Sequence, residues 1–100
     1  MTGAEFKTIR IKLGRAPEAF ARALGYSGSA QSCRTTTYCF ESGHRAIPDT
    51  VARLAVMLGR HGIPDAAWFD GDALTRLVAM FRHHGVPAER SFESNVNAGA

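Results

Sequence analysis

Long apolar runs are missing from this chain of 100 residues. No stretch approaches the roughly 20 consecutive apolar residues that a membrane-spanning helix needs, so we expect no membrane partner. The N-terminus also lacks the basic start and apolar stretch that mark a secretory signal. The sequence therefore predicts a cytoplasmic protein.

Cysteine is scarce, because the chain contains only Cys33 and Cys39. A disulfide between them is conceivable, but side chains six residues apart in a helix diverge, which favours reduced thiols. Together with His44 they match no common zinc spacing, and the neighbouring His83 and His84 point to different sides of a helix. We therefore expect no metal site and no cofactor.

Catalytic motifs are absent from the sequence as well. It contains no phosphate-binding glycine loop, no nucleophile elbow and no pair of carboxylates arranged for acid–base chemistry. We therefore expect a protein that is not an enzyme and name no catalytic residue.

With 45% apolar residues, a chain of this length builds one compact core. A single compact domain is the prediction.

Basic residues are concentrated in the first part of the chain. The whole chain carries a net charge of +3. Residues 1–60 contain nine Lys and Arg against four Asp and Glu, a net charge of +5. Residues 61–100 contain three against five, a net charge of −2. This asymmetry suits an acidic partner of the first part, although an unevenly decorated solvated surface explains it equally well.

Two short helices are predicted at the start of the chain. Thr2 and Glu5 form a capping pattern for a helix over residues 3–13, which Gly14 ends. Pro17 is suited to the first turn of a second helix that runs to about residue 24 and is closed by Gly25. Its buried residues should include Phe20, Ala21 and Leu24.

The third element admits two interpretations. Three consecutive threonines in residues 35–40 allow a strand, since β-branched residues are mediocre helix formers. A helix over residues 29–42 is favoured, because Cys33, Thr37 and Phe40 recur at helical spacing and Gly43 follows as a terminator. A lone short strand would also lack a partner.

The opposite side of this third helix is polar. It should present side chains suited to reading base edges in a DNA groove, and these are Gln31, Arg34, Thr35 and Tyr38. Residues placed to contact the phosphate backbone are Arg15, Ser29, Ser42 and Arg45. An ordinary solvated helix face and unpaired surface arginines are the alternative interpretation.

A fourth helix should follow Pro48, with Val51, Leu54, Ala55 and Leu58 on one face.

The first part of the chain resembles the lambda-repressor-like and Cro-like family of helix-turn-helix transcription regulators. The resemblance rests on three segments, EFKTIRIKLG, PEAFARALGYS and FESGHRAIPDTVARLAVML. The resemblance spans roughly residues 1–60. It implies an all-α fold, a compact lambda-repressor-like helix-turn-helix bundle of four helices plus an added C-terminal helix.

The same resemblance implies that the helix over residues 29–42 enters the major groove of double-stranded DNA. Family members often open the second helix with a Ser cap and a Gln, where this chain has Ala16 and Pro17. The spacing from the GYS turn to Gly43 is also long, so we expect a wide loop before the third helix or a late start of it.

Residues 61–86 should form a connector and a last helix that starts near Asp72 and ends near His84. ARLAVMLGRHGIP at 52–64 and TRLVAMFRHHGVP at 75–87 resemble each other, and shared helix-stop chemistry explains this. His61 and His84 should be the last helical residues, with Ile63 and Val86 folded back on the preceding helix. Trp68 and Phe69 should be core residues, and little regular structure is expected in the tail, residues 87–100.

The last helix carries an apolar stripe with two alternative destinations, the core of the same chain or the same stripe in a second subunit. We favour a homodimer, since two-fold symmetry suits a palindromic site on DNA. The stripe consists of Leu74, Leu77, Val78 and Phe81.

The sequence predicts a DNA-binding transcriptional regulator, a small repressor or autoregulator of a bacterial, phage or mobile-element operon. The alternative is a helix-turn-helix scaffold that binds a protein partner, such as a phage inhibitor of a host complex or an antitoxin.

Overall fold

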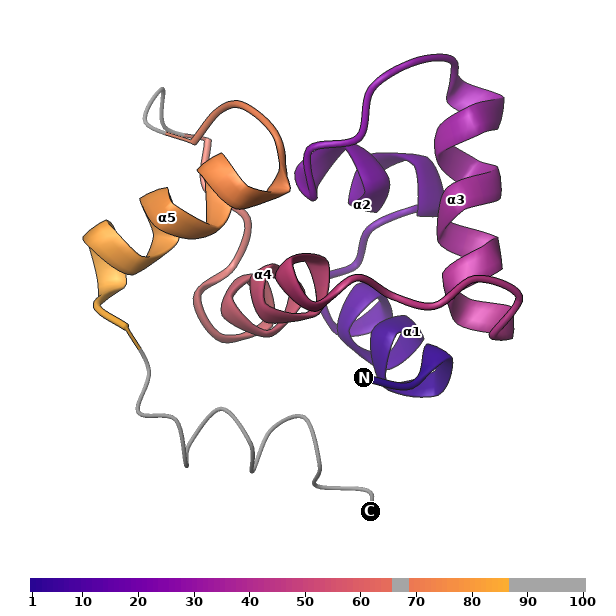
Figure 1. Ribbon diagram of the computed structural model, residues 1–100, viewed down its shortest axis with the longest axis horizontal. Coiled ribbons are helices and arrows are strands. Elements are labelled where there is room, and N and C mark those ends of the chain that lie inside the picture. The colour runs from indigo at the N-terminus through magenta and orange to yellow at the C-terminus, as the bar shows by residue number, and fades with distance from the viewer. Residues whose placement is uncertain (66–68, 87–100) are drawn as a thin grey trace.

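Five helices make up the regular structure in the computed structural model, which describes residues 1–65 and 69–86. They are α1 (Gly3–Lys12), α2 (Pro17–Ala23), α3 (Ala30–Ser42), α4 (Asp49–His61) and α5 (Ala73–His84) (Figure 1). No strand occurs within these two ranges, so the all-α prediction is confirmed and the strand interpretation of residues 35–40 is wrong. The predictions for Trp68 and the tail concern residues outside these ranges.

Side chains cap three of the helices at the positions that the sequence indicated. Thr2 Oγ1 accepts a hydrogen bond from the Glu5 backbone N–H at 3.1 Å, and Glu5 Oε1 accepts one from the Thr2 N–H at 2.9 Å. Ser29 and Asp72 cap α3 and α5 by accepting hydrogen bonds from the backbone N–H groups of Ser32 and Thr75. Ala16 leaves α2 without a side-chain cap, as expected from the sequence. Local capping chemistry therefore fixes where these helices begin.

The expected loop before α3 is present. Six residues, 24–29, separate the end of α2 from the start of α3. Gly25 in this loop has a φ of 97°, and a Cβ built on it would lie 2.7 Å from backbone atoms of Asp72 and Ala73. The loop between α2 and α3 therefore presses against the backbone at the start of α5.

Three phenylalanines join the first three helices. The ring of Phe6 on α1 lies 5.0 Å from that of Phe20 on α2 and 5.5 Å from that of Phe40 on α3. All three rings are buried. Aromatic pairs at such separations add to the stabilisation that burial gives. The three helices thus share one core.

The fourth helix lies at the centre of the bundle, next to α1 and α5 (Figure 1). It buries seven residues, namely Val51, Ala52, Leu54, Ala55, Val56, Met57 and Leu58. Both α4 and α5 end at a histidine, as the repeated pattern predicts. Ile63 packs against the core, but Val86 is 72% exposed, so the prediction that it folds back on α5 is wrong. The following glycines have ψ values near 160–170°, which carry the chain away from a compact left-handed cap.

The apolar stripe of α5 is divided between core and surface. Leu77 is 4% exposed and packs in the core, and Phe81 is partly buried against it. Leu74 and Val78 are 59% and 39% exposed. Leu77 is thus a core residue and does not belong to a surface that a second copy could reach. Only Leu74 and Val78 form an exposed apolar pair on this helix.

Candidate nucleic-acid interface

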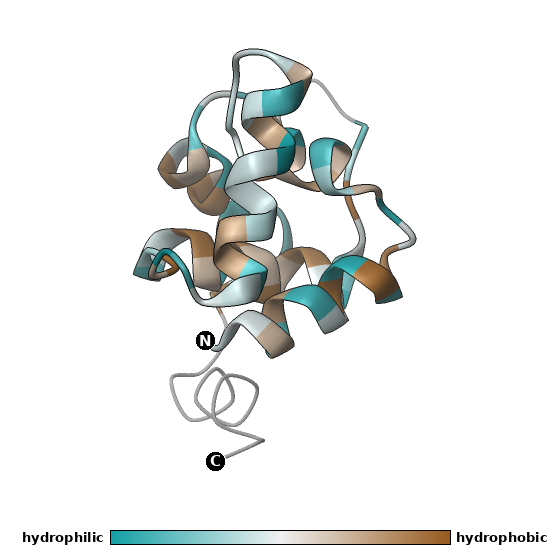
Figure 2. Ribbon diagram, turned by 90° about the vertical axis from the view of Figure 1, so that its right-hand side faces the viewer, coloured by the Kyte–Doolittle hydropathy of each residue, from teal (hydrophilic) through white to brown (hydrophobic). Residues whose placement is uncertain are grey.

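The third helix lies on the outside of the bundle and is seen face-on in Figure 2. Cys33, Thr37 and Phe40 are each 1% exposed, so the side that was predicted to face inward does so. Gly43 ends the helix in the left-handed conformation, with φ 80° and ψ 6°. The opposite side of α3 is therefore left for solvent or a partner.

A hydrogen bond fixes α3 against the start of α2. Thr37 Oγ1 donates to the carbonyl oxygen of Pro17 at 2.8 Å, and Thr37 is buried. A buried hydroxyl without a partner would be destabilising, so this contact also explains why a polar residue is tolerated here. The sequence pattern placed Thr37 inward but gave no indication of its partner.

All four predicted base-reading side chains lie on the exposed face of α3. Gln31, Arg34, Thr35 and Tyr38 are exposed, and Tyr38 is 54% exposed. Arg34 lies 3.9 Å from the carboxylate of Glu18 on α2, and both side chains are about half-exposed. An exposed pair at this distance restrains a guanidinium weakly. The face therefore presents flexible donors and acceptors on a rigid helix.

Of the four predicted phosphate contacts, Ser29, Ser42 and Arg45 lie at the ends of α3, Arg15 does not, and all four are exposed. Ser29 accepts from the Ser32 N–H as the helix cap, and Ser42 donates to the Cys39 carbonyl at 3.3 Å. The guanidinium carbon of Arg45 lies 5.9 Å from the centre of the Phe40 ring. Arg15 precedes α2 and lines a pocket on the other side of that helix.

Arg45 also influences a phenol beside it. Burial raises the pKa of Tyr26 above its ordinary value, while the positive charge of Arg45 lowers it. The ring of Tyr26 lies 6.0 Å from that of Phe40. Arg45 thus covers an aromatic cluster at the end of α3 while its charge remains accessible to solvent.

An ion pair that the sequence did not reveal joins α1 to α3. Arg10 Nε lies 2.6 Å from Glu41 Oε2, and Arg10 Nη2 donates to Glu41 Oε1 at 3.2 Å. The two side chains are 13% and 8% exposed. Arg10 Nη1 also donates to the carbonyl of Arg15, so the guanidinium links α1, α3 and the loop before α2. The partners lie 31 residues apart, and no local pattern marks them.

A groove runs between α1 and α3, with a volume of about 480 Å³. Its lining includes Lys7, Arg10, Thr35, Tyr38, Cys39 and His44. Thr35 and Tyr38 are predicted base-reading residues, whereas Lys7 and His44 were not singled out by the sequence. The exposed face of α3 is therefore continuous with a concavity that contains Lys7 and the Arg10–Glu41 ion pair.

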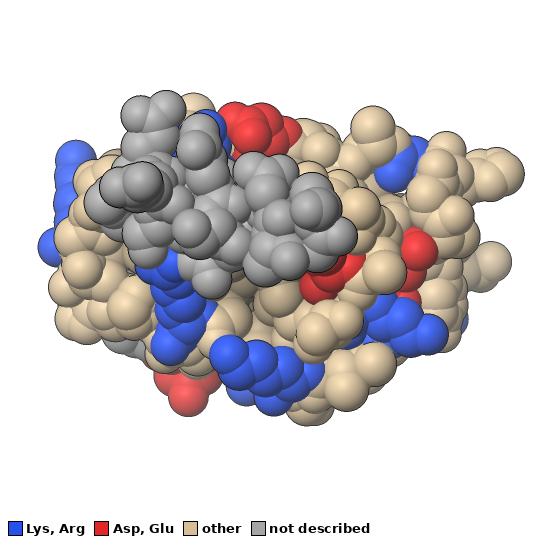
Figure 3. Space-filling model, turned by 90° about the horizontal axis from the view of Figure 1, so that it is seen from below, with Lys and Arg blue, Asp and Glu red and all other residues tan. Residues whose placement is uncertain are grey.

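Basic side chains occur on several parts of the surface. Seen from below, separate groups of Lys and Arg lie between uncharged regions, with fewer acidic groups among them (Figure 3). Helix α1 contributes Lys7 and Lys12, both exposed. On the part of this face that Figure 3 shows, Lys and Arg are thus distributed as several groups.

Within residues 1–65 and 69–86, no group of three or more His, Cys, Asp or Glu side chains is arranged to hold a metal ion. None of the helices in these ranges is long and apolar enough to span a bilayer. Comparison with protein-family models, with curated proteins and with solved structures finds no match to the chain. Function must therefore be argued from the site itself.

Proposed function

We propose that the protein is a sequence-specific DNA-binding transcriptional regulator with a lambda-repressor-like arrangement, in which α2 and α3 act as the helix-turn-helix pair. In this proposal α3 enters the major groove and α2 lies across the phosphate backbone. The protein would act in the cytoplasm as a small repressor or autoregulator of a bacterial, phage or mobile-element operon.

One observation carries the proposal. A thirteen-residue helix, α3, is anchored by three buried side chains and exposes Gln31, Arg34, Thr35 and Tyr38 on its other side. Gln and Arg make bidentate contacts with adenine and guanine edges, and Thr can contact the methyl group of thymine. A rigid helix with such a face has the size and chemistry that the major groove admits.

Residues around α3 support contacts to phosphate. Arg15 and Arg45 supply charge from the loops that precede α2 and follow α3, while Ser29 and Ser42 supply hydroxyl groups at the two ends of α3. Lys7, in the groove beside Tyr38, is a further candidate. Phosphate contacts fix register on the duplex, and base contacts select the sequence.

A homodimer is part of the proposal. A second copy would cover Leu74 and Val78 on α5, and two copies of α3 would then read the two halves of a palindromic site.

The test is selection of bound duplexes from random DNA, followed by fluorescence anisotropy on the selected site. If roughly four arginines per dimer neutralise phosphates, affinity should fall about a hundredfold between about 50 and 200 mM salt. Arg45→Ala should weaken binding to all sequences similarly. Gln31→Ala and Arg34→Ala should change the preferred sequence, at about 1–3 kcal/mol per lost base contact.

Arg60→Ala in the last turn of α4 is the matched control, because it removes the same charge from a residue outside α3 and outside the α5 face that carries Leu74 and Val78. It should leave affinity and preference unchanged. Selection that enriches no sequence, together with Gln31 and Arg34 variants that bind DNA as the unchanged protein does, would refute the proposal.

The second candidate function is a protein-binding module, such as a phage inhibitor of a host complex or an antitoxin. The groove between α1 and α3 favours it, because the largely exposed ring of Tyr38 lies at its edge. Tyrosines are enriched at protein interfaces. Failure of the DNA selection, combined with a purified partner that is lost in Tyr38→Ala, would support this function.

A further inference from the structure

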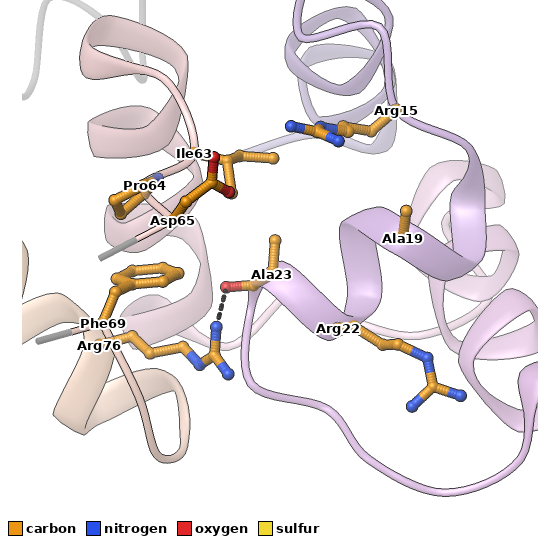
Figure 4. A pocket seen from close by; sticks show the side chains of 9 residues that line it. All are labelled: Arg15, Ala19, Arg22, Ala23, Ile63, Pro64, Asp65, Phe69 and Arg76. Carbon is orange, nitrogen blue, oxygen red and sulfur yellow. Dashed lines mark hydrogen bonds between the residues drawn. The ribbon is translucent and has the colours of Figure 1, made fainter. Parts of the chain in front are cut away.

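A second concavity lies on the other side of α2, away from α3. It has a volume of about 280 Å³ and is formed by α2, the loop before it, the segment after α4 and the start of α5 (Figure 4). Residues from these elements that line it include Arg15, Ala23, Ile63, Pro64, Phe69 and Arg76. The volume is at the lower end of the range of about 300–1,000 Å³ that is typical of small-molecule sites.

Arg76 forms a fixed, charged part of this pocket. Its Nη1 donates to the carbonyl of Ala23 at 3.2 Å, and its Nε donates to that of Gly71 at 2.7 Å. The guanidinium carbon lies 4.7 Å from the centre of the Phe69 ring. Burial lowers the pKa of Arg76, against the opposing effect of Asp70. A positive charge that has lost part of its hydration attracts an anion more strongly than one in water.

Arg15 supplies the donor that remains available. Its guanidinium points into the pocket toward Ile63 (Figure 4). In the part of the chain that the structure describes, no Asp or Glu forms an ion pair with it. Arg22 also lines the pocket, but its Nε lies 3.0 Å from Glu18 Oε2 and its guanidinium points away from the cavity. The charge of Arg22 is therefore used elsewhere.

Among the residues that the structure describes, the rest of the lining is apolar except for one carboxylate. Ile63, Pro64 and the ring of Phe69 face the same cavity as the Arg15 guanidinium (Figure 4). Asp65 lies beside them. A negative charge at this position repels a second one, so a doubly charged phosphate ester is disfavoured relative to a singly charged group.

We propose that this pocket binds a small organic carboxylate with an apolar body. The carboxylate accepts paired hydrogen bonds from the planar fork of Arg15, with the charge of Arg76 nearby. The apolar body lies against Ile63, Pro64 and Phe69. The ligand is monoanionic because of Asp65, and the pocket admits a molecule of about the size of one substituted ring.

The experiment is an NMR titration of the full chain with benzoate at constant ionic strength, without DNA. Benzamide serves as the neutral probe of the same shape, and phenyl phosphate as the doubly charged one. Benzoate should shift the amide signals of Ala23, Ile63 and Phe69 saturably and bind about tenfold more tightly than either other probe. Arg15→Gln should weaken benzoate about tenfold, and Arg15→Lys should retain an intermediate affinity.

Arg53→Gln on α4 is the charge-matched control and should bind benzoate as the unchanged protein does. Equal affinity for benzoate and benzamide, or unchanged benzoate affinity in a folded Arg15→Gln variant, overturns the proposal. So do shifts confined to residues outside the pocket, and so does the absence of any saturable shift. Because no DNA is present, each outcome is independent of the proposed regulatory function.

Discussion

Arg10 and Glu41 form a nearly buried pair in which one guanidinium donates to both oxygens of one carboxylate. The pair connects the last turn of α1 to the last turn of α3. If α3 is the helix that reads DNA, this contact sets its angle relative to the rest of the bundle. It is thus a positioning contact at the end of the proposed recognition helix.

Removal of one partner of this pair should be costly. Glu41→Gln leaves a buried guanidinium without its counter-charge, and we expect a loss of about 3–5 kcal/mol in the free energy of unfolding. Urea denaturation measures it. The combined variant Arg10→Met/Glu41→Leu should recover most of this loss, because an apolar pair replaces the ions. Arg53→Gln, which breaks the exposed pair with Asp49, should cost less than about 1 kcal/mol.

A methyl group should not be tolerated at Gly3. A Cβ there would lie 2.3 Å from the carbonyl oxygen of Glu41, so α1 and the end of α3 must move apart. We expect Gly3→Ala to lower the melting temperature and to cost about 2 kcal/mol or more. At Gly59 the nearest atom is Ile9 Cγ2, at 3.3 Å. Gly59→Ala should be close to neutral, since a gain of about 1 kcal/mol in helix propensity offsets mild crowding.

Stability should depend on pH through the histidines at the ends of α4 and α5. The rings of His61 and His84 stack at 3.7 Å with an interplanar angle of 4°, and His83 lies edge-on to His84 at 4.7 Å. Burial of the ring lowers the pKa of His84, and the charges of His61 and His83 lower it further. The folded protein therefore binds this proton less readily than the unfolded chain.

Stability should consequently fall as the pH drops through the ordinary histidine value of about 6.5 toward the lowered pKa of the folded state. Urea denaturation at a series of pH values measures the slope. The slope should flatten in His84→Gln and persist in His44→Gln, because His44 lies beyond the end of α3 and outside this cluster. Equal slopes in all three proteins would contradict the prediction.

The exposed pair on α5 should be needed for self-association. Leu74→Lys/Val78→Lys places charge on the proposed dimer surface, and sedimentation should show self-association weakened at least about tenfold, with the fold retained. Thr75→Lys adds a charge to an exposed position on the same helix and serves as the control. Leu77→Ala should instead lower the free energy of unfolding by about 2–5 kcal/mol, since Leu77 is a core residue. A double variant that sediments as the unchanged protein does would exclude this surface.

Most of the helix pattern could be predicted from the sequence because it depends on local chemistry. Caps at Thr2, Ser29 and Asp72 are marked by single residues, and the inward side of α3 is marked by helical spacing of Cys33, Thr37 and Phe40. The division of the α5 stripe was not predicted. Helical spacing identifies an apolar side but does not tell which part of it a neighbouring helix covers.

Contacts between residues far apart in the chain could not be predicted, because no local pattern in a single sequence marks the two partners. Glu41 is an ordinary acidic residue near the end of a helix until α1 brings Arg10 beside it. The pocket beyond α2 likewise depends on Arg15 and Arg76, which line one cavity only once the start of α5 lies beside the end of α2. The exposed face of α3 was predicted from helical spacing, whereas the surfaces beside it required the tertiary structure.

The contact of Gly25 with the backbone at Asp72 and Ala73 has one more consequence. Any side chain at position 25 would clash with this backbone, so the start of α5 and the loop between α2 and α3 would have to move apart. A truncated chain that stops at residue 61 would also lose the packing of α5 against α4. Leu77 and Met80 of α5 belong to the same core as the first four helices, so we expect residues 1–60 alone to be less stable than the whole chain.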